Sequence, residues 1–118
     1  MQEKSINYWE TYSPVVQWMS FRIMLTLAAI ENLHTKSIDF VLAYPQADLD
    51  VDIYMELPQG FNVGPESGRC FLNLKKNLYG LKQANHNWFE KLSSALGNLS
   101  INPIKGYPCV FIGDEIIV

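Results

Sequence analysis

Residues 37–44 read Ser37-Ile38-Asp39-Phe40-Val41-Leu42-Ala43-Tyr44, and this stretch decides which fold the sequence is expected to adopt. A continuous apolar run is typical of a strand buried on both faces, so residues 35–41 are predicted to form one. The run contains one carboxylate, Asp39, and an unpartnered charge in a protein interior is costly. Asp39 therefore needs a cation, a metal ion or a cage of hydrogen bonds. The structural alternative is an Asp at a strand end that accepts backbone hydrogen bonds.

Helical and extended segments surround this strand. Ser20 is a favoured N-cap residue and predicts a helix over residues 21–32. Apolar spacing predicts a second helix over residues 85–99, and Gly113-Asp114 predicts a hairpin between residues 109–112 and 115–118. The other predicted segments are a turn or short helical piece at Pro45, strands over residues 53–57 and 70–74, and a loop over residues 62–68. This order predicts an α+β fold, with a mostly antiparallel sheet and two helices packed on one face.

Composition places the chain among globular proteins, since its 118 residues are 48% hydrophobic and 18% charged. The length allows at most one domain, or part of one. A net charge of -3 argues against a free-standing, strongly basic nucleic-acid binder. The charges are nevertheless segregated, because residues 39–56 carry five acids and no base, whereas residues 69–89 carry four bases and no acid. Such neighbours suit a site for metal ions and phosphates, although charge alone favours a solvated loop beside a solvated helix.

The other metal-binding residue types form no recognisable site. Cys70 and Cys109 lie in apolar runs without metal-ligand spacing, which predicts reduced, buried thiols. The run Asp48-Leu49-Asp50-Val51-Asp52 lacks the glycine and the closing glutamate of an EF-hand loop, so it is predicted to be an exposed acidic turn. His34 and His86 have no paired ligands at metal spacing and are predicted to lie at the surface.

Five short motifs occur along the chain in a fixed order and spacing. They are Thr11-Tyr12-Ser13-Pro14-Val15-Val16, residues 37–46, Tyr54-Met55-Glu56-Leu57-Pro58-Gln59-Gly60-Phe61, Leu78-Tyr79-Gly80-Leu81-Lys82-Gln83 and Trp88-Phe89-Glu90-Lys91-Leu92. Together they closely resemble the reverse transcriptase of copia-type retrotransposons, over essentially the whole chain. Two positions depart from the family pattern: Asn85 stands where many relatives have Pro, and Tyr107 stands where an Asp often precedes the Pro-Cys pair.

The resemblance implies roles for the residues around Asp39. Asp39 matches the first catalytic aspartate of the polymerase palm, a ligand of two Mg²⁺ (or Mn²⁺) ions in the intact enzyme. The backbone carbonyl of Phe40 matches a second ligand to one of these ions. Tyr44, preceded by Ala43 as in the family, matches the aromatic steric gate that clashes with a ribose 2′-hydroxyl and admits deoxyribose.

The resemblance also assigns the later motifs. Gln83 matches the glutamine that contacts the incoming nucleotide, and Lys82 beside it is expected to touch phosphate or template. Lys75 and Lys76 are expected to approach the nucleic-acid backbone, a solvated surface being the alternative. The two aromatic residues at 88 and 89 could stack on bases, but their helical spacing favours core packing.

Taken together, the resemblance implies part of an RNA-directed DNA polymerase that copies an RNA template from a DNA primer with deoxynucleotide triphosphates. No membrane association is expected, and the location is cytoplasmic, with a virus-like particle or the nucleus for an intact element. The chain is expected to be a partial palm-and-fingers domain over residues 1–118. The basic fingers strand should precede Met1 and the aromatic-x-Asp-Asp motif should follow Val118, so the chain alone should be inactive. Two alternatives remain, a degenerate or domesticated remnant that acts as a weak nucleic-acid-binding or interaction module, and an inactive pseudogene product.

Overall fold

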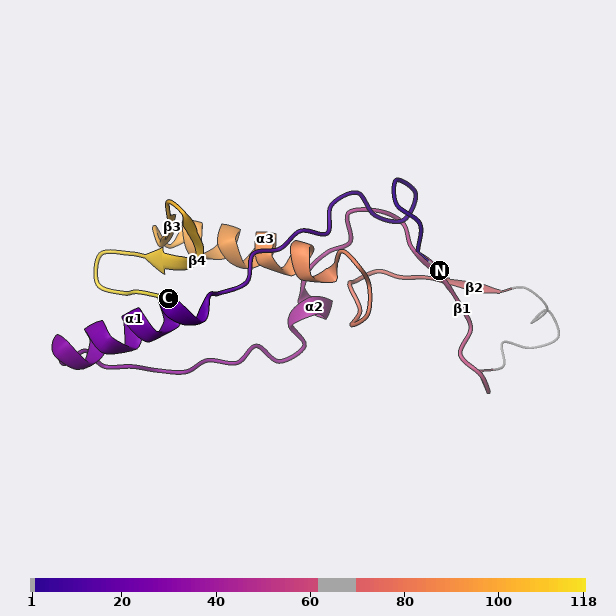
Figure 1. The fold of residues 1–118 in the computed structure, drawn as a ribbon. Coiled ribbons are helices and arrows are strands. Elements are labelled where there is room, and N and C mark those ends of the chain that lie inside the picture. The colour runs from indigo at the N-terminus through magenta and orange to yellow at the C-terminus, as the bar shows by residue number, and fades with distance from the viewer. Residues whose placement is uncertain (1, 62–69) are drawn as a thin grey trace. The chain divides into compact units, whose positions relative to one another are not determined.

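The computed structural model describes residues 2–61 and 70–118, which form an α+β chain (Figure 1). The elements follow in the order α1 (Trp18–Ile30), α2 (Ala43–Gln46), β1 (Tyr54–Glu56), β2 (Phe71–Asn73), α3 (Ala84–Asn98), β3 (Asn102–Ile104) and β4 (Tyr107–Ile112). The chain divides into two compact units. Unit 1 comprises Met1–Thr11 and Leu42–Trp88, and unit 2 comprises Tyr12–Val41 and Phe89–Val118.

Unit 1 contains α2 and an antiparallel pair, β1 with β2, in the register Tyr54↔Asn73, Met55↔Leu72 and Glu56↔Phe71. Both strands were expected from their sequence, and each is one residue shorter at either end than predicted. The short helix α2 confirms the helical piece expected at Pro45. The predicted loop over residues 62–68 lies outside the described residues. Among the described residues of this unit, the buried side chains are Ala47, Ile53, Ala84, Asn77 and Gln83.

Unit 2 contains α1 and the antiparallel pair β3 with β4, which Gly106 joins through a turn at φ 88°. Past β4 the chain folds back, and Phe111 and Val118 exchange two backbone hydrogen bonds of 2.8 and 2.9 Å. The hairpin predicted around Gly113 is thereby confirmed. The strand β3 was not predicted, because its central residue is Pro103 and proline is disfavoured within strands.

The second predicted helix is confirmed as α3, which begins one residue before its expected start. The prediction that Ser20 caps the first helix is wrong. The helix begins at Trp18, its N-cap is Gln17 without a side-chain cap bond, and Ser20 is a buried residue of the first turn. Along α1 the least exposed side chains are Ser20, Met24 and Ala28, which follow one another at four-residue spacing and so share one face.

Two further expectations are wrong. The strand predicted over residues 35–41 does not form, since residues 33–40 have no regular structure and all of them are exposed. A strand exists only where a neighbour satisfies its backbone groups, and no ladder partner for this segment is present among the described residues. The single sheet under two helices is also wrong, because the strands form two separate two-stranded sheets, one in each unit.

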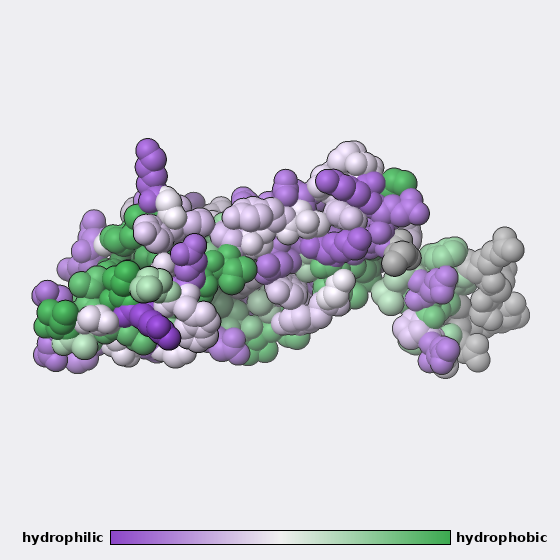
Figure 2. All heavy atoms as spheres, viewed as in Figure 1, coloured by the Kyte–Doolittle hydropathy of each residue, from purple (hydrophilic) through white to green (hydrophobic). Residues whose placement is uncertain are grey.

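Much of the apolar surface remains in contact with solvent. Figure 2 shows hydrophobic atoms gathered on the surface over α1 and the C-terminal strands. Trp18 and Met19 are 76% and 64% exposed, respectively. Within the described residues, no helix combines the length and apolar character needed to cross a bilayer.

Candidate functional site

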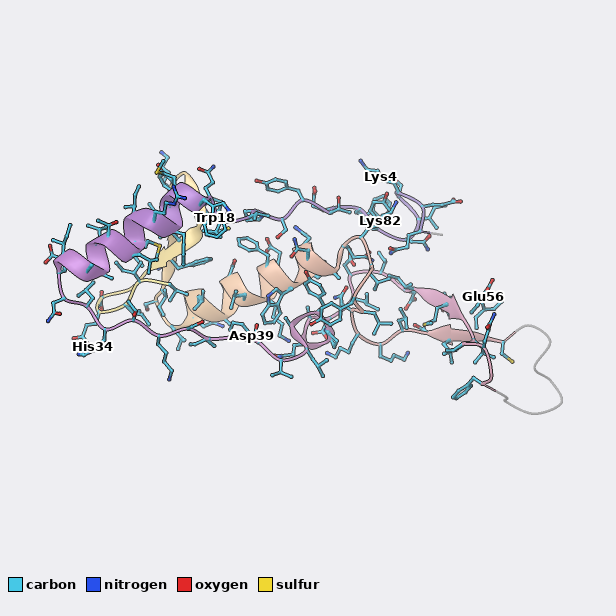
Figure 3. All side chains as sticks on the ribbon, turned by 60° about the horizontal axis from the view of Figure 1, so that its bottom comes forward. Lys4, Trp18, His34, Asp39, Glu56 and Lys82 are labelled. Carbon is cyan, nitrogen blue, oxygen red and sulfur yellow. The ribbon has the colours of Figure 1, made fainter. Side chains whose placement is uncertain are left out.

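Asp39 lies on the irregular segment after α1, in unit 2, with an exposed side chain (Figure 3). The prediction that its charge is buried is therefore wrong, and with it the need for a cation to offset desolvation. An exposed carboxylate can bind a ligand without prior rearrangement of a core. Phe40, which follows it, is 44% exposed.

Tyr44 lies in α2 of unit 1, half-buried, as is Ala43 before it. Leu42 precedes the helix with a left-handed φ of 54°, a conformation that bulky residues rarely adopt. The ring of Tyr44 packs on Tyr79 with 4.7 Å between centroids and 50° between planes. Its hydroxyl donates to Asn85 Oδ1 at 3.4 Å. The tyrosine of one sequence motif thus contacts the motif that contains Gly80.

Gln83 follows the Gly80 turn, and none of its surface is exposed. Its carboxamide Oε1 accepts from Gln2 Nε2 at 2.8 Å, and its Nε2 donates to the Asn7 carbonyl at 2.9 Å. Lys82 is exposed, and its Nζ donates to the Tyr8 hydroxyl at 3.2 Å and lies 4.9 Å from that ring's centroid. Both residues therefore have partners on the N-terminal segment.

Sequence reasoning missed a second group of amides in unit 1. Asn77 is fully buried and donates from Nδ2 to the carbonyls of Ala47 and Asp48, at 3.2 and 2.8 Å. Asn87 donates to Asp50 Oδ1 at 3.1 Å, and to Asn77 Oδ1 at 3.4 Å. An amide donor between two carbonyls holds the acidic turn against the segment before Gly80. The sequence offers one signal for Asn77: it is a single uncharged polar residue that stands between two lysines and an apolar run.

The acidic and basic segments do meet in unit 1. Lys76 Nζ forms an ion pair with Asp48 Oδ1, with side-chain exposures of 50% and 73%. Lys75 is exposed. The expectation of an exposed acidic turn is confirmed, since all three of its aspartates are exposed. An ion pair this exposed contributes little to the free energy of unfolding. Its main effect is on the orientation of the acidic and basic segments.

The cysteines are free, as predicted, but only half-buried, and burial raises the pKa of the Cys109 thiol. His34 is exposed, which confirms its surface position, and His86 is half-buried. Across the part of the chain that the structure describes, no three His, Cys, Asp or Glu side chains gather as a metal-binding group.

The candidate residues therefore divide between the units. Asp39 and Phe40 belong to unit 2, whereas the remaining ones belong to unit 1: Ala43, Tyr44, Lys75, Lys76, Lys82 and Gln83. Within unit 1, Tyr44 is joined to the Gly80 turn through Tyr79.

Comparison with known proteins confirms the family that the motifs indicated. The family model described as "Reverse transcriptase (RNA-dependent DNA polymerase)" matches residues 1–117. The chain is 40% identical over 111 residues to the Retrovirus-related Pol polyprotein from transposon TNT 1-94 of Nicotiana tabacum, covering 93% of the chain and 8% of that protein.

Two further relatives come from other organisms. Identity is 36% over 95 residues with the Retrovirus-related Pol polyprotein from transposon RE1 of Arabidopsis thaliana, which covers 80% of the chain and 6% of that protein. Identity is 30% over 107 residues with the Transposon Ty1-BL Gag-Pol polyprotein of Saccharomyces cerevisiae, and this match covers 90% of the chain and 6% of that protein. The chain thus spans 6–8% of the length of these relatives. No solved structure matches it. The chain belongs to the reverse transcriptase (RNA-dependent DNA polymerase) family, and it is similar to a segment of copia-type retrotransposon Pol polyproteins.

Proposed function

We propose that this chain is a palm-and-fingers segment of a polymerase that copies an RNA template into DNA, extending a DNA primer with deoxynucleotide triphosphates. The observation that carries the proposal is the family match over residues 1–117, together with five motifs in register. In such a reaction the primer 3′-hydroxyl attacks the α-phosphate of the incoming nucleotide and pyrophosphate leaves. The proposed setting is the cytoplasm, or a virus-like particle or the nucleus, without a membrane.

Asp39 is the proposed metal-binding catalytic carboxylate, with the Phe40 carbonyl as a second oxygen ligand. Carboxylate and carbonyl oxygens are ligands that Mg²⁺ and Mn²⁺ accept. The exposure of Asp39 supports this role, because an accessible carboxylate can bind a metal ion that also contacts a substrate phosphate. These two oxygens fall short of a metal site, since the described residues gather no group of three ligating side chains. The chain by itself is therefore expected to be inactive.

Tyr44 is the proposed steric gate, and Ala43 lies beside it in the nucleotide pocket. Its contact with Tyr79 supports this role, because a ring packed on a second ring is held in place and can exclude a 2′-hydroxyl by its bulk. The contact also joins the motif of Tyr44 to the motif that holds Lys82 and Gln83, the proposed nucleotide-contacting residues.

Gln83 keeps hydrogen-bonding groups that no described residue uses, but none of its surface is exposed, so its proposed contact with the nucleotide rests on the motif match. A carboxamide has two acceptor lone pairs and two N–H donors. The bonds to Gln2 and Asn7 use one of each among the described residues. Lys75 is the more available of the two lysines proposed to approach the nucleic-acid backbone, since Lys76 is paired with Asp48.

The decisive experiment is primer extension on an RNA template with Mg²⁺ or Mn²⁺, using the polyprotein that carries this chain. Asp39→Asn is expected to lower the rate about a thousandfold, because metal ions supply several kcal/mol of transition-state stabilisation. Glu31→Gln is the matched control, an exposed acid of the same unit, and should extend primers at the wild-type rate. Wild-type rates with Asp39→Asn would refute the proposed catalytic role.

The gate is tested in the same assay by comparing ribonucleotide with deoxynucleotide incorporation. Tyr44→Val should raise the relative use of ribonucleotides by about tenfold or more, because the bulk that excludes the 2′-hydroxyl is removed. Tyr54→Val, at an exposed strand position of unit 1, should leave the ratio unchanged. An unchanged ratio with Tyr44→Val would remove Tyr44 from the pocket.

A further inference from the structure

A short N-terminal segment contacts the turn that carries Lys82 and Gln83. We call residues 2–8 the N-terminal strap. Gln2 Oε1 accepts from the Lys82 backbone N–H at 3.0 Å, and Gln2 Nε2 donates to Gln83 Oε1 at 2.8 Å. Figure 3 shows Lys4, which marks the strap, beside Lys82. One side chain thus bonds both residues that the proposed function assigns to the nucleotide.

The strap makes two further contacts with the same turn. The Asn7 carbonyl accepts from Gln83 Nε2 at 2.9 Å, and the Tyr8 ring and hydroxyl hold Lys82 Nζ. The strap is also ordered by its own bonds, since Glu3 N–H donates to Asn7 Oδ1 at 3.0 Å and Asn7 N–H donates to the Glu3 carbonyl at 2.9 Å. It therefore presents its groups to the turn already arranged.

The polarity of these bonds allows one arrangement only. The Lys82 backbone N–H is solely a donor, so it requires the oxygen of Gln2 and turns the nitrogen of Gln2 towards Gln83. The Asn7 carbonyl is solely an acceptor, so it requires the nitrogen of Gln83. Flipping either amide would oppose two donors or two acceptors in a site where Gln83 has no exposed surface.

We propose that Gln2 is a positioning residue, which fixes the Gln83 carboxamide and the Lys82 backbone so that the turn is preorganised for the incoming nucleotide. The proposal rests on the proposed function of Lys82 and Gln83. Preorganisation of a binding group lowers the entropy lost when the ligand is bound. Loss of Gln2 should therefore weaken nucleotide binding and leave the chemical step unaffected.

The first test is amide hydrogen exchange in this chain, which needs no activity. Gln2→Leu removes both hydrogen bonds at similar size, and the Lys82 amide should exchange at least about tenfold faster, as expected for one lost hydrogen bond. Gln2→Glu retains an oxygen for the Lys82 N–H but turns a second oxygen towards Gln83 Oε1, so it should restore only part of the protection. The Leu74 amide, bonded to the Ile53 carbonyl at 2.9 Å in the same unit, should remain unchanged.

The second test is steady-state primer extension by the polyprotein. Gln2→Leu should raise KM for deoxynucleotides about tenfold with kcat within about twofold, the pattern of lost binding that is uniform between ground and transition states. Gln17→Leu is the control, since Gln17 is exposed and makes no side-chain cap bond to α1. Its KM should equal that of the wild type.

Three results would overturn the inference. Unchanged exchange of the Lys82 amide in Gln2→Leu would show that Gln2 does not order the turn. Faster exchange at both Lys82 and Leu74 would make Gln2 a general stabilising residue. Faster Lys82 exchange with an unchanged KM would show that the strap does not act on the nucleotide. Failure of the proposed function is distinguishable, because it would appear as wild-type extension by Asp39→Asn, with the exchange results unaffected.

Discussion

The two units bury different kinds of side chain. Among the described residues of unit 1, the largest fully buried side chains are amides: Asn77 donates to two backbone carbonyls and Gln83 to one. In unit 2 the buried side chains are mostly aliphatic or aromatic, with Phe111 and Val110 at 4% and 7% exposure. Apolar burial stabilises without direction, whereas buried amides stabilise only in one hydrogen-bonded arrangement. Unit 1 is therefore held in one geometry by directional hydrogen bonds, whereas unit 2 is held together by non-directional apolar packing.

The largest effect is expected at Phe111. Its ring packs against Phe89, with 6.5 Å between centroids. Phe111→Ala should lower the free energy of unfolding of unit 2 by about 3–5 kcal/mol, the usual cost of emptying a buried aromatic site. Hydrogen exchange of the Val118 amide, measured across a urea titration, reports this loss.

The control for Phe111 is a phenylalanine of unit 1. Phe71 is 59% exposed in β2, and Phe71→Ala should cost about 1 kcal/mol or less. If the two substitutions cost the same, burial in the C-terminal strands would not be what holds unit 2 together.

A smaller loss is expected from the amides of unit 1. Asn77→Ala deprives the Ala47 and Asp48 carbonyls of their shared donor, and should lower the free energy of unfolding of unit 1 by about 2 kcal/mol. Amide exchange at Leu74, which is bonded within this unit, is the measurement. Gln59→Ala, at an exposed position of the same unit, should change stability by about 0.5 kcal/mol or less. Equal effects of the two substitutions would refute a structural role for the buried amide.

The smallest effect concerns Cys109 of unit 2. Burial raises its thiol pKa, because the surroundings disfavour the charged thiolate. The neutral thiol therefore contributes stability that is complete below the unfolded-state pKa and is lost as pH rises through the folded-state pKa. In a Cys70→Ser background, alkylation of Cys109 should titrate at higher pH in the folded chain than in urea. A folded-state titration at or below that of the unfolded chain would contradict the apolar surroundings.

Local patterns predicted the elements whose residues carry their own periodicity or turn chemistry. The helix α3, the piece at Pro45, the strands β1 and β2, and the turn at Gly113 formed as expected. Each depends on residues close together in the chain, so short windows of sequence contain the required information. The expected strand over residues 35–41 failed because apolar composition favours burial but supplies no partner.

The candidate site shows the same division. The motifs around Asp39, Tyr44 and Gln83 were readable in the sequence, and the family that they indicated is confirmed by the match over residues 1–117. The hydrogen bond between Gln2 and Gln83, 81 residues apart, was not readable. A glutamine in the sequence does not indicate a buried partner, since glutamine is common at solvated surfaces.

The sequence by itself determined the family of this chain, the order of its motifs and most of its local elements, because these depend on residue identity at short spacing. Only the tertiary structure decided that the carboxylate of Asp39 is exposed, that the strands form two separate pairs, and that Gln83 is buried against the N-terminal strap. Burial and hydrogen-bond partners arise from contacts between distant segments, and those contacts exist only once the chain has folded.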